Sequence, residues 1–460
     1  MKRSWRDCQG WRDSNLPLTS ANDEACRLFD TAITQVTSMY ADAEMGGIGN
    51  TFKKMLEADP NFVMGQVLVN SMKYGESKSD TEDVRKAVVD ISNQAIQQEV
   101  TERESKYVAA LKQVAEGNIL QAAATNRSIL NDSPTDLLAC LLAFVKYYEL
   151  GMSKEILEMM SFVSKAYQPE TPGYSTILGW KAYAHEENLQ LVEAEQDVHK
   201  SLAVSPGEVF AIHTMAHIHL EKGMLDDGLA FLQSKAKYWE SSSLACHIAW
   251  HEALFYVEKG QFDDAVTTFD EKIITRLANP GNFNDASSLL YRLSFEDIHV
   301  PERWKSVLQH VDMLAGQYIW MYLDAHILLC LHRNGEKERA RAMLEELKEY
   351  VKENSATNAQ VTHDVGIPLC AGITAYEEGD LETAVNCLNS VRDSLHRIGG
   401  SIAQRDTFIQ LLLHSAIKSP NSKYSPLAGT LLMERKARRA EDPLGDRLML
   451  HGGERYNFVS

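Results

Sequence analysis

The chain has 460 residues, of which 44% are hydrophobic and 24% are charged. This balance is typical of a soluble globular protein and unlike that of a disordered or membrane-embedded chain. Acidic residues outnumber basic ones by 64 to 46, which gives a formal net charge of −18. Because such a surface repels phosphate backbones, we expect no nucleic-acid partner.

The longest apolar stretch, residues 137–145, is much shorter than the roughly 20 residues of a membrane span. No signal-peptide core follows the first residues of the chain. The seven cysteines are scattered and form no C-x-x-C pair, so neither a disulfide framework nor a cysteine zinc site is expected. We therefore expect a cytoplasmic protein that has no membrane partner.

In chain order, residues 22–60 and 61–99 each have the pattern of two helices, and they belong to a divergent N-terminal region, 1–102. A repeat follows in residues 103–280. Gly117 and Gly151 are 34 residues apart, which is the period of tetratricopeptide repeats. The units of this region are expected near 103–136, 137–170, 175–208, 209–242 and 246–279.

Each unit combines a turn glycine with a small residue five positions later, as in Gly223 and Gly228. The glycine ends the first helix in a left-handed or open conformation, and the small residue lets two helices approach where they cross. A proline or polar break such as Pro206 closes the unit, because proline cannot continue a helix interior. Two later units have the same pattern around Gly335 and Gly379.

Residues 281–400 are expected to hold further hairpins and repeats, and residues 401–460 a closing hairpin and tail. No stretch alternates as a strand would. The sequence therefore predicts an all-α fold, an α-solenoid of tetratricopeptide-type helical hairpins.

Histidines cluster in the middle of the array. When Gly223 and Gly260 are placed at the same repeat position, His213 and His217 take places that face the concave groove of such arrays. The same register places aromatic and further histidine side chains in this groove. Charged residues beside the apolar faces of later helices are expected to line it as well. The candidate groove residues are Tyr183, His213, His217, His247, Trp250, His251, Arg292, Asp324, His326, Asp364 and Arg405.

His213 and His217 are four residues apart, a spacing that lets two imidazoles on one helical face share a metal. This is half of a site, and a third ligand would have to come from His247, Cys246 or an acid on another helix. The plainer interpretation is that the rings hydrogen-bond one another, the backbone or water. We accordingly assign no metal ligands, no cofactor and no catalytic residue from the sequence, and keep a histidine general base as an open alternative.

Structural roles are also available to the charged candidates. Asp364 can cap a helix that starts near Val365, and Arg405 with Asp406 can form an ordinary ion pair. The basic residues around 435–439 are expected to be solvated and to complement the dipole of the last helix.

A chaperone C-terminal tail is disfavoured as a ligand. Its carboxylates need cationic donors, whereas the corresponding groove places hold Phe210, His213, His217, His247, Trp250 and His251.

Several segments resemble a known family: DCQGWRDSNLPLTS, HTMAHIHLEKG, CHIAWHEALFYVEKGQFDDA, DVGIPLC and GGSIAQRD. Over essentially its full length the chain is similar to tetratricopeptide repeat protein 38 and its relatives. This resemblance implies a soluble tetratricopeptide solenoid and brings no reaction, substrate or catalytic residue with it.

Two functions follow as hypotheses. The first is a non-enzymatic scaffold that binds a peptide or helix of another protein in its concave groove. The alternative is a histidine-using or metal-dependent enzyme or small-molecule binder with a site around His213, His217 and His247.

Overall fold

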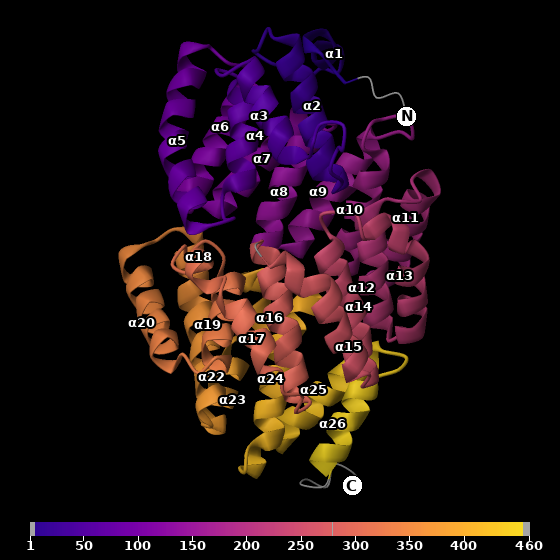
Figure 1. The fold of residues 1–460 in the computed structure, drawn as a ribbon, viewed down its shortest axis with the longest axis vertical. Coiled ribbons are helices and arrows are strands. Elements are labelled where there is room, and N and C mark those ends of the chain that lie inside the picture. The colour runs from indigo at the N-terminus through magenta and orange to yellow at the C-terminus, as the bar shows by residue number, and fades with distance from the viewer. Residues whose placement is uncertain (1–4, 278, 454–460) are drawn as a thin grey trace. The chain divides into compact units, whose positions relative to one another are not determined.

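The computed structural model of the chain describes residues 5–277 and 279–453. Throughout these residues the chain is helical, contains no strand, and is built of successive helical hairpins (Figure 1). The predicted fold class, an all-α α-solenoid of tetratricopeptide-type hairpins, is confirmed. Among the described helices, none combines the length and the apolar character needed to cross a membrane.

The chain forms two compact units. Unit 1 contains the described residues up to Ile212 together with Ser241–Leu244. Its helices are α1 (Cys8–Asp13), α2 (Asp23–Ser38), α3 (Ile48–Ala58), α4 (Val63–Lys73), α5 (Lys78–Gln97), α6 (Glu102–Ala115), α7 (Ile119–Asp132), α8 (Leu137–Glu149), α9 (Ser153–Val163), α10 (Tyr174–Glu186), α11 (Leu191–Val204) and the first turn of α12 (Val209–Lys222).

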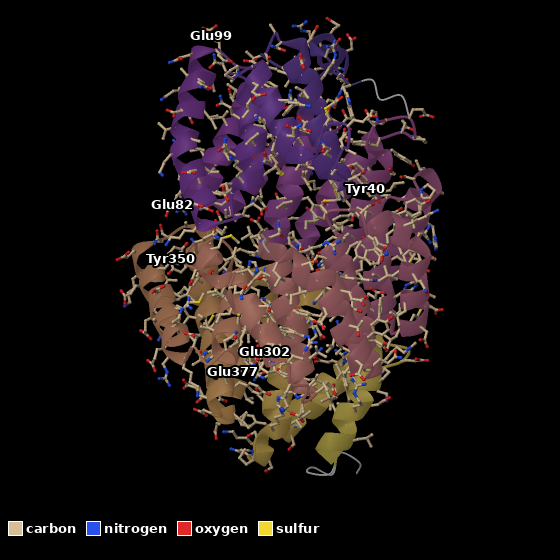
Figure 2. The ribbon with its side chains drawn as sticks, viewed as in Figure 1. Tyr40, Glu82, Glu99, Glu302, Tyr350 and Glu377 are labelled. Atoms are coloured by element: carbon tan, nitrogen blue, oxygen red, sulfur yellow. The ribbon has the colours of Figure 1, made fainter. Side chains whose placement is uncertain are left out.

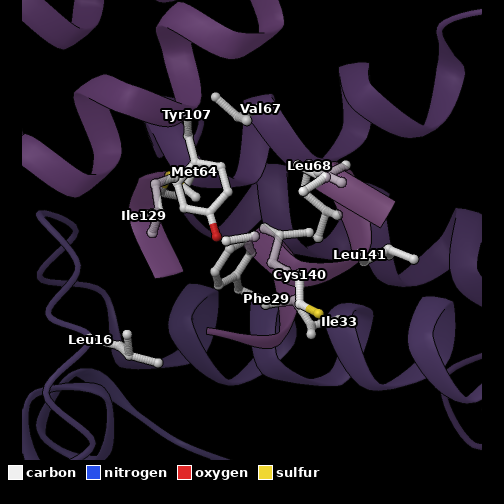
Figure 3. Close-up of a cluster of buried hydrophobic side chains, with 14 of the residues drawn as sticks. Leu16, Phe29, Ile33, Met64, Val67, Leu68, Tyr107, Ile129, Cys140 and Leu141 are labelled. Atoms are coloured by element: carbon white, nitrogen blue, oxygen red, sulfur yellow. The ribbon is translucent and has the colours of Figure 1, made fainter. Parts of the chain in front are cut away.

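Unit 1 has an apolar core that its helices share. Figure 3 shows part of it, where Phe29 and Ile33 of α2, Met64 of α4 and Cys140 of α8 lie among other buried side chains. Phe29 also contacts Phe62, with ring centroids 5.2 Å apart. Aromatic side chains are large, so their burial contributes strongly to the stability of such a core.

Unit 2 contains residues His213–Glu240 and those from Ala245 onward. Beyond α12, its helices are α13 (Leu225–Trp239), α14 (Ala245–Lys259), α15 (Phe262–Thr268), α16 (Pro280–Phe295), α17 (Pro301–Leu308), α18 (Val311–Leu314), α19 (Met321–Arg333), α20 (Lys337–Glu353), α21 (Thr357–Val361), α22 (Ile367–Glu378), α23 (Leu381–Val391), α24 (Ile402–Lys418), α25 (Ser425–Arg438) and α26 (Pro443–Gly453).

The turn glycines behave as their spacing predicts. All of those singled out have positive φ angles, between +62° and +85°, in the turn that follows the first helix of a hairpin: Gly117, Gly151, Gly223, Gly260, Gly335 and Gly379. In the hairpin of α10 and α11 the corresponding turn holds Leu189, at φ +58°. Gly228 confirms the need for a small residue at the helix crossing, because a Cβ there would lie 2.5 Å from the ring of Phe255.

One expectation about the surface is wrong. Arg435 and Arg439 were expected to be solvated, but both are buried and pair with acidic side chains of α14 and its neighbours. Local sequence cannot reveal this, since Glu258, which pairs with both arginines, lies 177 positions before Arg435. Lys436, between them, is exposed as expected.

Gly223 and Gly335 permit a direct test of what the turn glycines do. Both have left-handed backbone conformations, φ +70° and +78°, in which alanine costs on the order of 1 kcal/mol. A Cβ at residue 223 would in addition overlap the carbonyl oxygen of Glu441, whereas nothing lies within 4 Å of one at residue 335.

We predict that Gly223→Ala lowers the free energy of unfolding more than Gly335→Ala does, because only the first adds a steric overlap to the backbone strain. Urea unfolding followed by circular dichroism measures both losses. Equal losses would contradict the close approach of Glu441.

Candidate functional site

Four histidines of unit 2 meet in its interior. His213 and His217 lie one turn apart on α12, and His247 and His251 lie one turn apart on α14, the first helix of the next hairpin. Side chains four residues apart share a helix face, so two such pairs can face each other across neighbouring helices. One ring nitrogen from each of the four residues lies within 4.8 Å of all the others. We call these residues the four-histidine cluster.

The shortest contacts in the cluster converge on one atom. His213 Nε2 lies 2.9 Å from His217 Nε2 and 3.0 Å from His247 Nε2. The His251 ring packs against the other three, with centroid distances of 4.4 Å to His217, 4.9 Å to His247 and 5.2 Å to His213. Because a ring nitrogen carries either one hydrogen or one lone pair, His213 Nε2 cannot form two linear hydrogen bonds at once.

An acidic side chain of α16 orients the cluster. Asp285 Oδ2 lies 2.7 Å from His247 Nδ1, and Gln404 Nε2 of α24 donates to Asp285 Oδ1 at 3.2 Å. The carboxylate accepts a hydrogen bond from the Nδ1–H of His247, and in that tautomer the lone pair of His247 is on Nε2, the atom that faces His213. Histidines that bind metals in proteins are held in this way by an outer carboxylate.

Burial favours the neutral form of two of the four histidines. His213, His217 and His251 are buried, and the side chain of His247 is 16% exposed. Loss of solvent, reinforced by the neighbouring imidazoles, lowers the pKa of His213 and of His251 well below the usual value of histidine. Neither nitrogen of His251 has a hydrogen-bond partner among the described residues. His213 and His251 are therefore held as neutral imidazoles, the form whose lone pair can act as a ligand.

Further polar groups of α16 extend from the cluster. Trp250 stacks on His247, with centroids 5.3 Å apart and planes 16° apart, and its Nε1 donates to Ser288 Oγ at 3.0 Å. Arg292 donates to the same hydroxyl oxygen at 3.1 Å and to the carbonyl oxygen of Ala403 at 2.7 Å. These contacts join α14, α16 and the start of α24.

The predicted groove residues on these helices are interior. His213, His217, Trp250, His251 and Arg292 are each at most 4% exposed. Helix α24 packs on α16 and bonds to Arg292 through the Ala403 carbonyl. This corrects the expectation that these side chains line an open groove, because they are buried within unit 2.

The remaining candidates are not members of the four-histidine cluster. Tyr183 belongs to unit 1, where its ring lies 5.8 Å from that of Phe144 and 5.6 Å from that of Phe210. His326 is buried on α19 and its Nδ1 lies 2.8 Å from the Tyr322 carbonyl oxygen. Asp324 is buried on α19, and its Oδ2 has no hydrogen-bond partner among the described residues.

Two charged candidates have ordinary structural roles. Asp364 caps no helix; it lies in a π-helical turn, Thr362–Gly366, where it pairs with His363 at 2.8 Å and Arg397 at 2.9 Å. Arg405 donates to the carbonyl oxygen of Gly400. Its expected partner, Asp406, pairs with Arg435 instead, at 3.2 Å.

Sequence reasoning found the four histidines but missed Asp285 and Gln404. Asp285, Ser288 and Arg292 follow one another at helical spacing, so a polar stripe on α16 was detectable from the sequence. Gln404 carried no such signal, because it reaches Asp285 from 119 residues away.

The hairpins, the turn glycines and this interior site define a helical repeat protein of tetratricopeptide type. No family model matches the chain. Among solved structures, it is similar to a tetratricopeptide repeat protein from Parabacteroides merdae, with 12% identity and a TM-score of 0.34; the match covers 65% of this chain and 99% of that one. It is also similar to yeast Tom70, with 11% identity and a TM-score of 0.42, over 96% of this chain and 95% of that one. These values transfer no residue role to this chain.

Asp324 allows the cost of a buried charge in unit 2 to be measured. Burial raises the pKa of its carboxyl group to about 7, above the value of about 3.9 in an unfolded chain. Folding therefore favours the protonated acid. The resulting stability is fully present below about pH 4 and is lost as the pH rises through 7.

We predict that between pH 5.5 and pH 8 the wild type loses up to about 2 kcal/mol more stability than Asp324→Asn, which cannot ionise. Urea unfolding at the two pH values measures the difference. If both proteins had the same pH dependence, Asp324 would be ionised throughout.

Proposed function

We propose that this helical repeat protein binds one divalent transition-metal ion in the four-histidine cluster. The observation that carries the proposal is the convergence of four ligand nitrogens within 4.8 Å of one another in a buried site. Zinc–nitrogen bonds are about 2.0–2.1 Å long, so tetrahedral ligand nitrogens lie about 3.4 Å apart. Small rotations of the imidazole rings bring the cluster to that spacing.

A metal also resolves the hydrogen-bonding conflict at His213. Its Nε2 faces two other Nε2 atoms and can satisfy only one of them through a shared proton. A cation at the centre accepts the lone pairs of all these nitrogens simultaneously. The neutral state that burial imposes on His213 and His251 is the state that binds a metal.

The ligand chemistry selects the class of metal. Imidazole nitrogens suit Zn²⁺, Cu²⁺ and Ni²⁺, whereas Ca²⁺ and Mg²⁺ require oxygen ligands. Four protein ligands complete a tetrahedral shell, as they do in structural zinc sites. A hydrolytic role would require one imidazole to leave the metal, so we favour metal holding over the histidine-dependent enzyme that the sequence left open.

We predict that the purified protein binds one Zn²⁺ or Co²⁺ per chain, and that the double variant His213→Ala, His217→Ala binds none, because two of the four ligands are lost. Equilibrium dialysis with elemental analysis measures the stoichiometry, and the visible absorption of bound Co²⁺ reports tetrahedral nitrogen ligation. His199→Ala, whose side chain is 67% exposed on α11, is the control for adventitious binding to surface histidines.

The same titration of Asp285→Asn tests whether Asp285 supports metal binding by orienting His247. Loss of an outer carboxylate typically weakens metal binding about 10- to 100-fold and leaves the stoichiometry unchanged. Metal binding that persists in the double histidine variant, or is absent from the wild type, would overturn the proposal.

A second candidate function is protein interaction, with another protein as the partner, and helix α5 of unit 1 supports it. Val84, Val88 and Ile91 face the core, whereas Val89 and Ile96 are 59% and 77% exposed on the outer face. Those two lie seven residues apart, which places them on the same side of the helix. In Figure 2, Glu82 lies on α5 near its first residue, and Glu99 lies in the turn that follows the helix. An amphipathic helix of a partner can pack on such a face.

We predict that Val89→Glu with Ile96→Glu abolishes capture of the partner proteins that the wild type retains, because two charges replace the apolar contact. Val192→Glu on α11, at an equally exposed valine, is the control. Quantitative mass spectrometry of the captured proteins compares the three. Identical partner sets would exclude α5 as the interaction surface.

We also propose that the chain is a member of the tetratricopeptide repeat protein 38 family and works in the cytosol. The segments that resemble this family support the first statement. The second is supported by the cysteines, all seven of which are free thiols.

A further inference from the structure

The C-terminal segment, residues 435–447, contacts the two helices that carry the four-histidine cluster. Glu221 lies one turn after His217 on α12, and Glu258 lies two turns after His251 on α14. Arg439 joins the two: its Nη1 lies 3.2 Å from Glu258 and its Nη2 3.8 Å from Glu221. One side chain from the end of the protein thus spans both histidine-bearing helices.

Arg435 makes a second connection to α14. Its guanidinium group pairs with Glu258, with Asp406 of α24 at 3.2 Å and with Asp442 at 2.9 Å. All of these side chains are at most 15% exposed. Although burial raises the pKa of Glu258, Arg435 and Arg439 lower it overall, so the carboxylate stays ionised. A buried ionised group that loses its partner is strongly destabilised, so the helices and the segment stay together.

The segment also caps the ends of both helices. The backbone amide of Ala440 donates to the carbonyl oxygen of Lys222, the last residue of α12, at 2.8 Å. Arg447 donates to the carbonyl oxygens of Val257 and Glu258 near the end of α14, at 2.9 and 2.8 Å. Cationic groups at a helix C-terminus satisfy free carbonyls and interact favourably with the helix dipole.

Helix α24 connects the C-terminal segment to the cluster by a second route. It carries Asp406, which pairs with Arg435, and two residues earlier Gln404, which holds Asp285. Asp285 in turn orients His247. The C-terminal segment is therefore connected to the cluster through α12 and α14 directly and through α24 and α16 indirectly.

We propose that metal binding in the cluster and closure of the C-terminal segment are coupled. The segment holds α12 and α14 at the separation that brings four imidazoles around one ion, and the bound ion, by joining the same helices, holds the segment closed. This proposal rests on the metal site proposed above. Arg439 and Arg447 are positioning residues in it, because they act on the ligands through the helices and do not reach the metal.

Coupling of two sites must be reciprocal in free energy, so it can be measured from either side. From the metal side, the probe is Zn²⁺ added to the full-length wild type, with hydrogen exchange of residues 435–447 as the readout. We expect Zn²⁺ to slow exchange in this segment, the Ala440 amide included, by about tenfold or more, because closure protects its hydrogen bonds.

From the segment side, the readout is the Zn²⁺ affinity, determined by competition with a chelator. We expect Arg447→Ala to weaken Zn²⁺ binding on the order of 5- to 150-fold, the usual range for coupled sites, with one ion per chain still bound. Arg439→Gln should do the same. Lys436→Ala is the matched control: it removes a cation from the same segment, but among the described residues this lysine forms its ion pair with Asp446 of that segment, at 2.8 Å.

The outcomes separate the two proposals. A wild type that binds no Zn²⁺ overturns both. Zn²⁺ binding with unchanged exchange in residues 435–447, or with the same affinity in Arg447→Ala and Lys436→Ala, overturns the coupling and leaves the metal site standing. If Arg439→Gln does not fold, Arg447→Ala and the exchange measurement on the wild type still decide the question.

Discussion

Helix α14 places a polar stripe in the interior of unit 2, and the neighbouring helices supply its partners. His247, His251 and Glu258 share one face of this helix, at spacings of four and seven residues. Once removed from water, each of them needs a compensating contact. Helix α12 contributes two imidazoles, α16 contributes Asp285, and the C-terminal segment contributes two guanidinium groups. The arrangement of these elements in unit 2 follows from that one requirement.

In unit 1 a buried polar side chain finds its hydrogen-bond partners within the chain, in contrast to the four-histidine cluster of unit 2. Its buried Asp136 receives hydrogen bonds from Arg103 at 2.8 Å, from Tyr107 at 2.6 Å and from the backbone of Ala139. These donors satisfy the carboxylate within the chain, and no ligand is called for. The cluster in unit 2 brings four like groups together, and His213 Nε2 faces both His217 Nε2 and His247 Nε2, of which it can bond linearly to one; this is the feature behind the proposed cation site.

The interior position of the site also changes what the repeat architecture does. In a repeat array the concave face is commonly the surface that binds a partner. Here α24 packs against α16, and Trp250, Ser288 and Arg292 are used in contacts within the chain. These side chains are used in contacts within unit 2, so under the proposed function a protein partner would use the outer surface.

The sequence by itself determined the all-α fold, the turn glycines and the pairing of histidines four residues apart. These are local features: they depend on helical periodicity and on backbone conformations that a few neighbouring residues set. The tertiary structure alone decided that His247 meets Asp285, that Gln404 reaches this carboxylate, and that Arg435 and Arg439 are buried. Gln404 and Asp285 are 119 positions apart, and Arg435 and Glu258 are 177 apart. No local pattern encodes these contacts, because they depend on how successive hairpins pack to bring distant side chains out of water and into contact.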